Sequence, residues 1–461
     1  MMTVTTVLTG RARRRPKAMG AAPLAALCAL LALICLAAVP QGARAEAAQG
    51  AFVWSAPWSF GTTDSSFVVD LVKGPSGTVY AAGSTGYGQV TSTAFVARLR
   101  TSDGSQVWRK TRAGVYLAAA ASDPGRNVVI AGNKGGDIAI VKYRASDGKV
   151  LWSRTWGGTT TTEYAHDLTI ARDGSIYVAG ARRTSSTRKD AVVVCLSPGG
   201  AVRWRHLTAT KGDDIAEAVT TDAAGRCYVT GGRQGEGDSM VWTTYQLSPA
   251  GKRLWLRNVT FVSSDTFGEG LWLRVRDDAL YVVAQRGTVT PRFAAQKLTP
   301  GGKERWLTGS YALPAAAYFN DATVDSTGRL YMVGSLRDPG TPGVASQGVL
   351  VVTRAGGAVA WHDAFENPLG DFSTTFDGVA VDASGRAYCA GSLGTAMGDV
   401  DQAAVVVRYE ASAGIETIWR WDGGAGGGNG FGPLLRDSVV VVGGQATTAG
   451  GSRAVVHRLR Q

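Results

Sequence analysis

Short apolar segments separated by polar turns follow one another along almost the whole chain. Residues 163–204 are typical, because their pattern predicts four strands at 163–171, 175–180, 190–196 and 201–204. Asp173-Gly174 and Pro198-Gly199-Gly200 separate two of these pairs, and Asp, Gly and Pro are the residues that favour tight turns. The pattern predicts an all-β unit of four antiparallel strands.

This unit repeats along the chain. Its second strand ends at a small residue in eight copies, which are Gly83, Gly132, Gly180, Gly231, Ala284, Gly334, Gly391 and Gly443. Its fourth strand carries a tryptophan in seven copies, spaced 44 to 58 residues apart, which are Trp108, Trp152, Trp204, Trp255, Trp306, Trp361 and Trp419. Tandem four-stranded units of this length predict the blades of a β-propeller.

The two ends of the chain complement each other. The eighth copy stops after its third strand, 454–459, whereas Phe52-Val53-Trp54 precedes the first copy without partners of its own. Trp54 and Trp58 also have the spacing of Trp152 and Trp156. Because an open ring would leave unpaired backbone groups, we expect the N-terminal strand to complete the last blade. The prediction is eight blades closed in this way, with seven blades as the alternative.

The predicted third strands are continuous apolar runs such as 95–97 and 405–407. Strands buried on both faces lose the alternation of apolar and polar residues, as expected for sheets stacked face to face. We expect the repeated tryptophans to be core residues that pack between blades.

Two segments carry a resemblance to a known repeat. Residues 190–200 read Asp-Ala-Val-Val-Val-Cys-Leu-Ser-Pro-Gly-Gly, and residues 222–231 read Asp-Ala-Ala-Gly-Arg-Cys-Tyr-Val-Thr-Gly. These segments resemble the bacterial SBBP-type β-propeller repeat, and the resemblance covers 51–461. Copies two and five depart from it, with Val129 in place of Tyr and Ala284 in place of Gly. The resemblance implies a propeller and export, and it implies no chemistry.

The Gly-x-x-x-Trp turns show a weaker resemblance to the repeats of quinoprotein dehydrogenases. Those enzymes carry two adjacent cysteines beside the quinone, whereas Cys195, Cys227 and Cys389 are far apart here. Each lies in an apolar run and is expected to be a buried small hydrophobic residue. We therefore expect no quinone cofactor.

The N-terminus has the pattern of an export signal. A basic stretch, 11–17, precedes an Ala- and Leu-rich segment, 18–39, and Ala43-Arg44-Ala45 has small residues where a signal peptidase cleaves. This pattern predicts a signal peptide at 1–45, a propeller domain at 46–461, and a secreted or extracytoplasmic protein. The alternative is an uncleaved membrane anchor, because about 20 apolar residues can span a bilayer.

Charge argues against a nucleic-acid partner. The formal net charge is +12, but six basic residues precede the predicted cleavage point and no acidic residue does. The other charges are interspersed without a long run of one sign. Such a mixed surface is typical of a solvated protein rather than a DNA- or RNA-binding one.

One polar pattern marks a candidate site. Counting back eleven and ten positions from the tyrosine of the second strand reaches a polar residue in several copies, and Asp70 has this position in the first. Glu269 fits if the turn of the fifth copy is one residue shorter. The candidate ligand-binding residues at the mouth of the axial channel are His166, Asp167, Glu217, Glu269, Asn320, Asp321 and Asp377.

Clustered carboxylates would suit calcium, a sugar or a cationic ligand. The alternative is a water-filled channel whose side chains accept hydrogen bonds from neighbouring strands. The recurrent Asp-x-x-Gly segments, such as 222–225, suit a tight turn better than a calcium loop, which needs several oxygen ligands.

No nucleophile motif or metal-ligand spacing is present in the sequence. The prediction is an exported, non-enzymatic binding or scaffold propeller for a protein, a glycan or a small ligand. The alternative is a secreted hydrolase or lyase with carboxylates at the channel mouth.

Overall fold

The computed structural model describes residues 48–460 apart from internal gaps. The gaps are 59–65, 87–91, 186–187, 235–239, 261–267, 288–290, 309–310, 312, 314, 338–345, 366–371, 396–402, 411, 413, 422–427, 437–438 and 449–450. Residues 47–461 form one compact unit. The predicted signal peptide lies outside the described residues.

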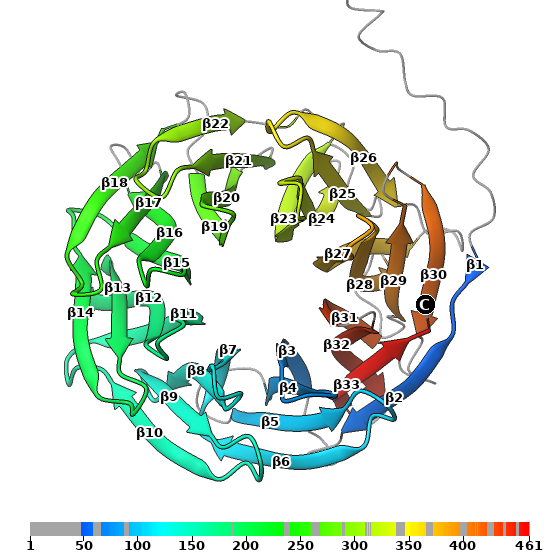
Figure 1. Ribbon diagram of the computed structural model, residues 1–461, viewed down its shortest axis with the longest axis horizontal. Helices are drawn as coiled ribbons and strands as arrows, with labels where there is room; N and C mark the ends of the chain where they lie inside the picture. Colours follow the sequence, from blue (N-terminus) through cyan, green and yellow to red (C-terminus); the bar gives the residue numbers. More distant parts are fainter. Residues whose placement is uncertain are drawn as a thin grey trace, which may run out of the picture. The chain divides into compact units, whose positions relative to one another are not determined.

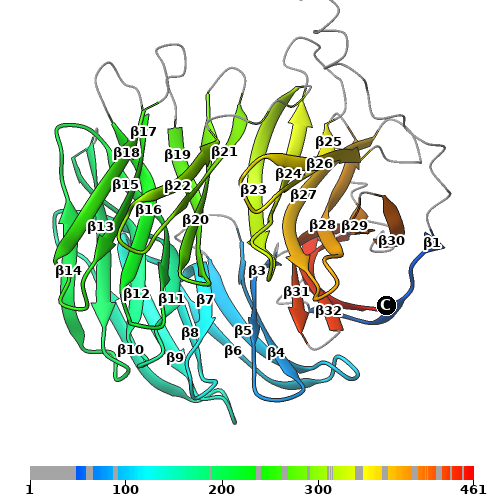
Figure 2. The same cartoon turned by 45° about the horizontal axis from the view of Figure 1, so that its top comes forward.

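The chain forms an eight-bladed β-propeller, as predicted. Eight four-stranded antiparallel blades stand around a central opening, with the first strand of each blade innermost (Figure 1). Viewed obliquely, the strands run up and down the wall of the ring (Figure 2). The alternative of seven blades is wrong.

The first four blades follow one another directly along the chain. Blade 1 consists of β3 (Ser66–Lys73), β4 (Thr78–Thr85), β5 (Thr93–Arg100) and β6 (Gln106–Ala113). Blade 2 consists of β7 (Tyr116–Ser122), β8 (Val128–Lys134), β9 (Asp137–Tyr143) and β10 (Val150–Trp156). Blade 3 consists of β11 (Thr162–Ile170), β12 (Ile176–Ser185), β13 (Arg188–Leu196) and β14 (Val202–Thr208). Blade 4 consists of β15 (Asp214–Thr221), β16 (Cys227–Gln234), β17 (Met240–Leu247) and β18 (Arg253–Val259).

The next three blades repeat this order. Blade 5 consists of β19 (Gly268–Arg276), β20 (Ala279–Arg286), β21 (Arg292–Leu298) and β22 (Glu304–Thr308). Blade 6 consists of β23 (Ala316–Val324), β24 (Leu330–Arg337), β25 (Gln347–Thr353) and β26 (Val359–Phe365). Blade 7 consists of β27 (Phe372–Val381), β28 (Ala387–Thr395), β29 (Ala403–Tyr409) and β30 (Ile415–Trp421).

Blade 8 takes its strands from both ends of the chain. Its inner strands are β31 (Gly428–Arg436), β32 (Val439–Thr448) and β33 (Gly451–Leu459), and β2 (Phe52–Trp58) is its outer strand. β2 and β33 are antiparallel, with Phe52 opposite Leu459 and Trp58 opposite Ala454. The short β1 (Ala48–Gln49) adds in parallel to β30 of blade 7. Closure by the chain ends is thereby confirmed.

The apolar core is divided among the blade interfaces. Eight clusters of buried side chains each span one pair of neighbouring blades, including one between blade 8 and blade 1. Second and third strands such as β4 and β29 are buried along their full length, because they are covered on both faces. This explains the apolar runs in the sequence.

The repeated tryptophans fasten the outer edge of one blade to the next. Each indole Nε1 donates to a carbonyl oxygen in the last turn of the following blade, over 2.7 to 3.2 Å, in Trp54, Trp108, Trp152, Trp204, Trp255 and Trp306. Trp204 also covers Gly251, whose φ of +78° and missing Cβ let the ring approach the turn. Several of these side chains are only partly buried, because the fourth strand forms the outer wall. Our expectation of core residues holds for Trp108 and Trp419, which are 7% and 0% exposed.

Candidate functional site

Every innermost strand contains a β-bulge near its middle. In blade 3, Ala165 pairs with Gly180 and Asp167 with Ala179, so that His166 is left without a partner on β12. The same shift occurs in all eight blades, and the bulged residues are Val69, Ala118, His166, Glu217, Leu271, Asn320, Asp377 and Phe431. A bulge re-aims the side chain that it carries. The eight bulges therefore form one repeated ring of positions around the channel.

In six blades a glycine of the second strand makes room for the bulge. A Cβ on Gly180 would overlap the carbonyl oxygen of Tyr164, which approaches because the bulge bends β11 toward β12. The corresponding glycines of blades 1, 2, 4, 6 and 7 meet the equivalent carbonyl oxygen in the same way. Blade 5 has Ala284 at this place and is still bulged.

Four of the predicted residues occupy the bulge itself, and they form two pairs. His166 Nδ1 lies 3.0 Å from Glu217 Oε2, across the boundary between blades 3 and 4. Asn320 Nδ2 donates to the Phe376 carbonyl oxygen at 2.9 Å and to Asp377 Oδ1 at 3.3 Å, across the boundary between blades 6 and 7. All four side chains are partly exposed or exposed. Figure 1 shows that their strands are the innermost of their blades, and we infer from this that the side chains are exposed toward the channel.

The acids that follow the bulge have a different environment. Asp167 Oδ2 accepts the Val219 N–H at 2.7 Å, and its Oδ1 accepts its neighbour's N–H, that of Leu168. Asp70 accepts the Ala120 N–H at 3.1 Å, and Asp321 accepts the Val379 N–H at 3.0 Å. In each case the donor belongs to the innermost strand of the next blade. These three aspartates tie one blade to the next, as in the alternative that we weighed from the sequence.

Burial changes the ionisation of these carboxyl groups. Desolvation raises the pKa of Asp70 to about 7 and that of Asp321 to about 6, although backbone N–H donors oppose the rise. Desolvation also raises the pKa of Asp167, against its two N–H donors and the positive charge of Arg274. On the channel side, desolvation raises the pKa of Asp377 to about 8.

Glu269 does not share the register of the other candidates. The turn between β19 and β20 has two residues with positive φ, Asp277 and Asp278, and is shorter than in most blades. A shorter turn moves the equivalent position closer to the second strand, so that Leu271 carries the bulge. Glu269 lies two residues earlier, opposite Gln285. Including it among the equivalent positions was therefore wrong.

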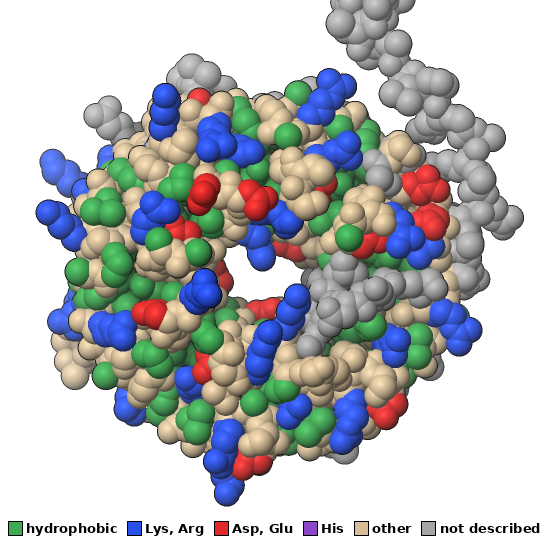
Figure 3. Space-filling view, in the orientation of Figure 1, with side chains coloured by type: hydrophobic (Ala, Val, Ile, Leu, Met, Phe, Trp, Pro, Cys, Tyr) green, Lys and Arg blue, Asp and Glu red, His purple; other side chains and the backbone are tan. Residues whose placement is uncertain are grey.

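The candidate residues also lie deeper than we expected. His166, Glu217, Asn320 and Asp377 are near the middle of their strands, because the glycines that permit the bulges lie in the middle of the second strands. They surround the waist of the channel, whereas the sequence pattern had suggested its mouth. On one face of the ring, Lys and Arg side chains gather around the opening and acidic side chains are visible inside it (Figure 3).

The Asp-x-x-Gly segments are turns, as expected. Asp222 Oδ1 accepts the N–H groups of Ala224 and Arg226, each at 3.0 Å, and Gly225 has a φ of +74°. Asp325 and Asp382 accept the equivalent N–H groups. Their carboxylates are thus used by the turn itself.

The three cysteines of the propeller are free and buried, as expected for small apolar residues. Burial raises the pKa of the Cys195 thiol to about 11, and burial also raises the pKa of Cys227 and Cys389. These thiols are protonated and unreactive near neutral pH.

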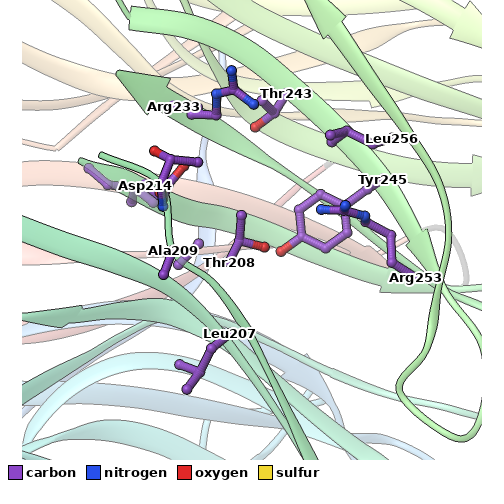
Figure 4. Close-up of a pocket in the computed structure, with 13 residues that line it drawn as sticks. Leu207, Thr208, Ala209, Asp214, Arg233, Thr243, Tyr245, Arg253 and Leu256 are labelled. Atoms are coloured by element: carbon purple, nitrogen blue, oxygen red, sulfur yellow. The ribbon is translucent and has the colours of Figure 1, made fainter. Parts of the chain in front are cut away.

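Sequence reasoning missed a cavity between blades 3 and 4. Its volume is about 300 Å³, and its wall includes Leu207, Thr208, Asp214, Arg233, Tyr245 and Arg253 (Figure 4). A signal for it was present in the sequence. Tyr245 occupies a central third-strand position at which Ala97, Val141, Val194, Val351 and Val407 stand in other blades.

Comparison with known proteins supports the fold alone. No family model matches the chain, and no curated protein matches it. The SBBP resemblance therefore stays a prediction. Among the residues that the structure describes, no helix is long and apolar enough to cross a membrane.

Solved structures that resemble the chain are β-propellers. A quinohemoprotein alcohol dehydrogenase from Pseudomonas putida is 12% identical, with a TM-score of 0.54 over 86% of this chain and 76% of that one. The quinohemoprotein alcohol dehydrogenase from Comamonas testosteroni is 14% identical, with a TM-score of 0.52 over 89% and 76%. Sqt1 from Chaetomium thermophilum is 11% identical, with a TM-score of 0.53 over 87% and 99%. Because one propeller fold hosts many activities, these matches do not transfer a function.

Proposed function

We propose that this protein is an exported, non-enzymatic binding module that holds a polar ligand at the waist of its central channel. The observation that carries the proposal is the ring of bulges, in which His166–Glu217 and Asn320–Asp377 present two close polar pairs to the channel. A bulge is built into all eight inner strands, yet only some of them use it to display a polar group. Concave surfaces with a few convergent polar groups are typical ligand sites.

Export is supported by the N-terminal sequence alone. Its basic stretch, apolar segment and Ala43-Arg44-Ala45 cleavage pattern have the order of a signal peptide. An uncleaved segment would instead anchor the propeller to a membrane.

The chemistry of the waist favours a hydrogen-bonding organic ligand such as a glycan over calcium. Calcium takes six to eight oxygen ligands. Asp70, Asp167 and Asp321 already accept backbone N–H groups, which leaves Glu217 and Asp377 as the predicted acids that face the channel. Each of these has a nitrogen-bearing neighbour, and such mixed donor and acceptor pairs match the hydroxyl groups of a sugar.

The alternative of a hydrolase or lyase has one observation in its favour. Asp377 has a pKa raised to about 8, so that it is protonated at neutral pH and has the form of a general acid. A matching base would have to reach the same substrate atom, and the His166–Glu217 pair lies on blades 3 and 4, on another part of the ring. The binding function therefore fits the geometry better.

A thermal-shift experiment tests the proposal with calcium chloride and a panel of neutral oligosaccharides as probes. The double variant Glu217→Gln, Asp377→Asn keeps the size of both side chains and removes both acids. Asp277→Asn is the matched control, because its side chain is 78% exposed in the turn after β19 and asparagine tolerates positive φ. A stabilising shift that is lost in the double variant and kept in the control supports the channel site.

The outcomes separate the versions of the proposal. A shift with calcium alone that requires both acids favours the metal. A shift that survives in the double variant places the ligand elsewhere. No shift with any probe contradicts ligand binding at the waist and leaves a water-filled channel.

A further inference from the structure

The cavity between blades 3 and 4 contains a buried carboxylate with a hydrogen-bond partner, in the described part of the chain, for only one of its two oxygens. Asp214, at the start of β15, is 1% exposed, and its Oδ2 accepts the Thr210 N–H at 2.7 Å. Its Oδ1 has no hydrogen-bond partner among the described residues. A buried acceptor without a donor is unfavourable, so that such an atom in a cavity is a place where a ligand donor would be stabilising.

Cationic and hydroxyl groups share this cavity. Arg233 stands opposite Asp214 in the β15–β16 pairing, and Arg253 comes from the start of β18. Figure 4 shows Asp214 and Arg233 on one side of the cavity and Arg253 on the other, with Thr208 and the Tyr245 hydroxyl between them. Thr210 and Thr243 also line it.

Two leucines give the cavity an apolar part. Leu207 and Leu256 line it and are each 37% exposed, like other apolar side chains of the outer strands such as Leu307. Exposed apolar side chains beside polar groups suit a ligand that has one apolar and one polar face.

We propose that this cavity, which is separate from the channel, binds a sugar acid, meaning a polyhydroxylated carboxylate of monosaccharide size. The carboxylate of the ligand lies against Arg253, and its hydroxyl groups contact Asp214 Oδ1, Thr208 and Tyr245. The C–H face of the sugar covers Leu207 and Leu256. The cavity volume of about 300 Å³ is at the lower end of the range for small-molecule sites.

The arrangement of charge selects hydroxyl groups over an ammonium group beside Asp214. Arg233 stands opposite Asp214 and its positive charge acts on this carboxyl group, although Asp190 acts in the other direction, so that an ammonium group at this end would meet a guanidinium of the same sign. Burial also raises the pKa of Asp214, and a hydroxyl can pair with the carboxyl group in either protonation state. An amino acid, which would bring its ammonium group to Asp214, therefore fits less well than a sugar acid.

Isothermal titration calorimetry on the purified protein tests this proposal with galacturonate, galactose and alanine. Galacturonate should bind, galactose should bind about tenfold more weakly because it lacks the carboxylate, and alanine should not compete. Asp214→Asn should weaken galacturonate binding about tenfold, and its remaining carbonyl oxygen still accepts the Thr210 N–H, so that the fold is kept.

A cycle of ligand and protein changes assigns the carboxylate to its partner. Arg253→Gln should weaken galacturonate binding about tenfold and leave galactose binding unchanged, because galactose has no carboxylate for the guanidinium to bind. Arg205→Gln is the matched control: Arg205 is an exposed arginine on β14 outside the cavity wall, and its variant should bind like the parent protein. The channel variant Glu217→Gln, Asp377→Asn should also keep galacturonate binding, which separates this proposal from the one for the channel.

Three results would overturn the proposal. One is the absence of heat at about 10 mM galacturonate, which is weaker than useful recognition. Another is equal weakening of galacturonate and galactose by Arg253→Gln. The third is preferential binding of alanine, which would show that the cavity selects an ammonium group.

Discussion

The innermost strands carry acidic side chains in two regions, the channel wall and the blade interfaces. Asp377 lies on the bulge of blade 7 and faces the channel, where Asn320 is its neighbour. Asp321 lies one residue after the bulge of blade 6 and accepts the Val379 N–H of blade 7. The two residues belong to neighbouring blades and differ by one position in register.

This difference separates candidate binding residues from structural ones. The carboxylate oxygens of the interface acids accept hydrogen bonds from backbone N–H groups that would otherwise be buried without partners. Channel acids meet other side chains and solvent. Successive side chains along a strand point to opposite faces, and the position of the bulge determines which residue points toward the channel.

The largest effect is expected from removing the bulge itself. Gly180→Ala places a Cβ on the carbonyl oxygen of Tyr164, and neither the Cβ, which is fixed to the backbone of β12, nor the carbonyl group, which belongs to the backbone of β11, has much room to shift. We expect a loss of about 3 kcal/mol or more in unfolding free energy, at the upper end for overpacking. Urea unfolding followed by tryptophan fluorescence measures it.

Blade 5 supplies the control for this substitution. Ala284 already occupies the equivalent position beside a bulge. Ala284→Gly should therefore cost only about 1 kcal/mol, from the added backbone entropy of glycine. Equal losses for the two variants would mean that the glycine is not what permits the bulge.

The second prediction compares the two acid positions directly. Asp167→Ala leaves the N–H groups of Val219 and Leu168 without acceptors and should cost about 2–4 kcal/mol. Glu217→Ala removes a partly exposed contact with His166 and should cost less than about 1 kcal/mol. If urea unfolding gives similar losses, the distinction between interface and channel acids fails.

A buried histidine extends the comparison to a base in a blade interface. His457 is 1% exposed, lies between the rings of Phe52 and Trp421, and has its Nδ1 2.7 Å from Ser55 Oγ. Burial lowers the pKa of His457 from 6.5 to about 3. Between these pH values the unfolded chain binds the proton and the folded protein does not, so that stability falls as the pH decreases.

The expected loss is about 2 kcal/mol on going from pH 6.5 to pH 5, from about 1.4 kcal/mol for each pH unit. His457→Gln cannot take up the proton and should lose this part of the acid sensitivity. Unfolding curves of both proteins at pH 5 and pH 7 measure this loss. Identical pH dependences would contradict a contribution of His457 to the acid sensitivity.

The smallest effect is expected from the channel acid and has the opposite sign. Because the pKa of Asp377 rises from 3.8 to about 8 on folding, the folded protein binds more protons between these pH values. Its stability therefore falls as the pH rises through this window. Asp377→Asn should flatten the curve by less than about 1 kcal/mol, since the side chain is partly solvated. A steeper curve in the variant would contradict the raised pKa.

Much of the fold could be predicted because it rests on local and repeated signals. The turn residues, the apolar third strands and the closing tryptophans recur at regular spacing, and the unmatched strand at Phe52 indicated how the ring closes. The alignment of Glu269 failed because this residue stands twelve positions before Tyr281, whereas the shorter turn of blade 5 puts the bulge at Leu271, ten positions before Tyr281. Spacing along the sequence gives the register of an inner strand only where the length of the turn is known.

The candidate site could be predicted only in part. Counting from the tyrosines found the polar positions of the inner strands, but it treated His166 and Asp167 as equivalent. The bulge between Ala165 and Asp167 is what directs one of them to the channel and the other to blade 4. The cavity between blades 3 and 4 was missed because Asp214, Tyr245 and Arg253 come from different strands.

The sequence by itself determined the eight four-stranded units, their closure by the chain ends and the residues of each turn, because these depend on short-range patterns of burial and backbone preference. The tertiary structure alone decided which carboxylates accept hydrogen bonds from the next blade, which carboxylates face the channel, and which groups meet in the cavity between blades 3 and 4. Those roles depend on one-residue register and on contacts between blades, such as that of Asp167 with Val219, 52 residues away. The alternation of apolar and polar residues along a strand reveals neither this register nor these contacts.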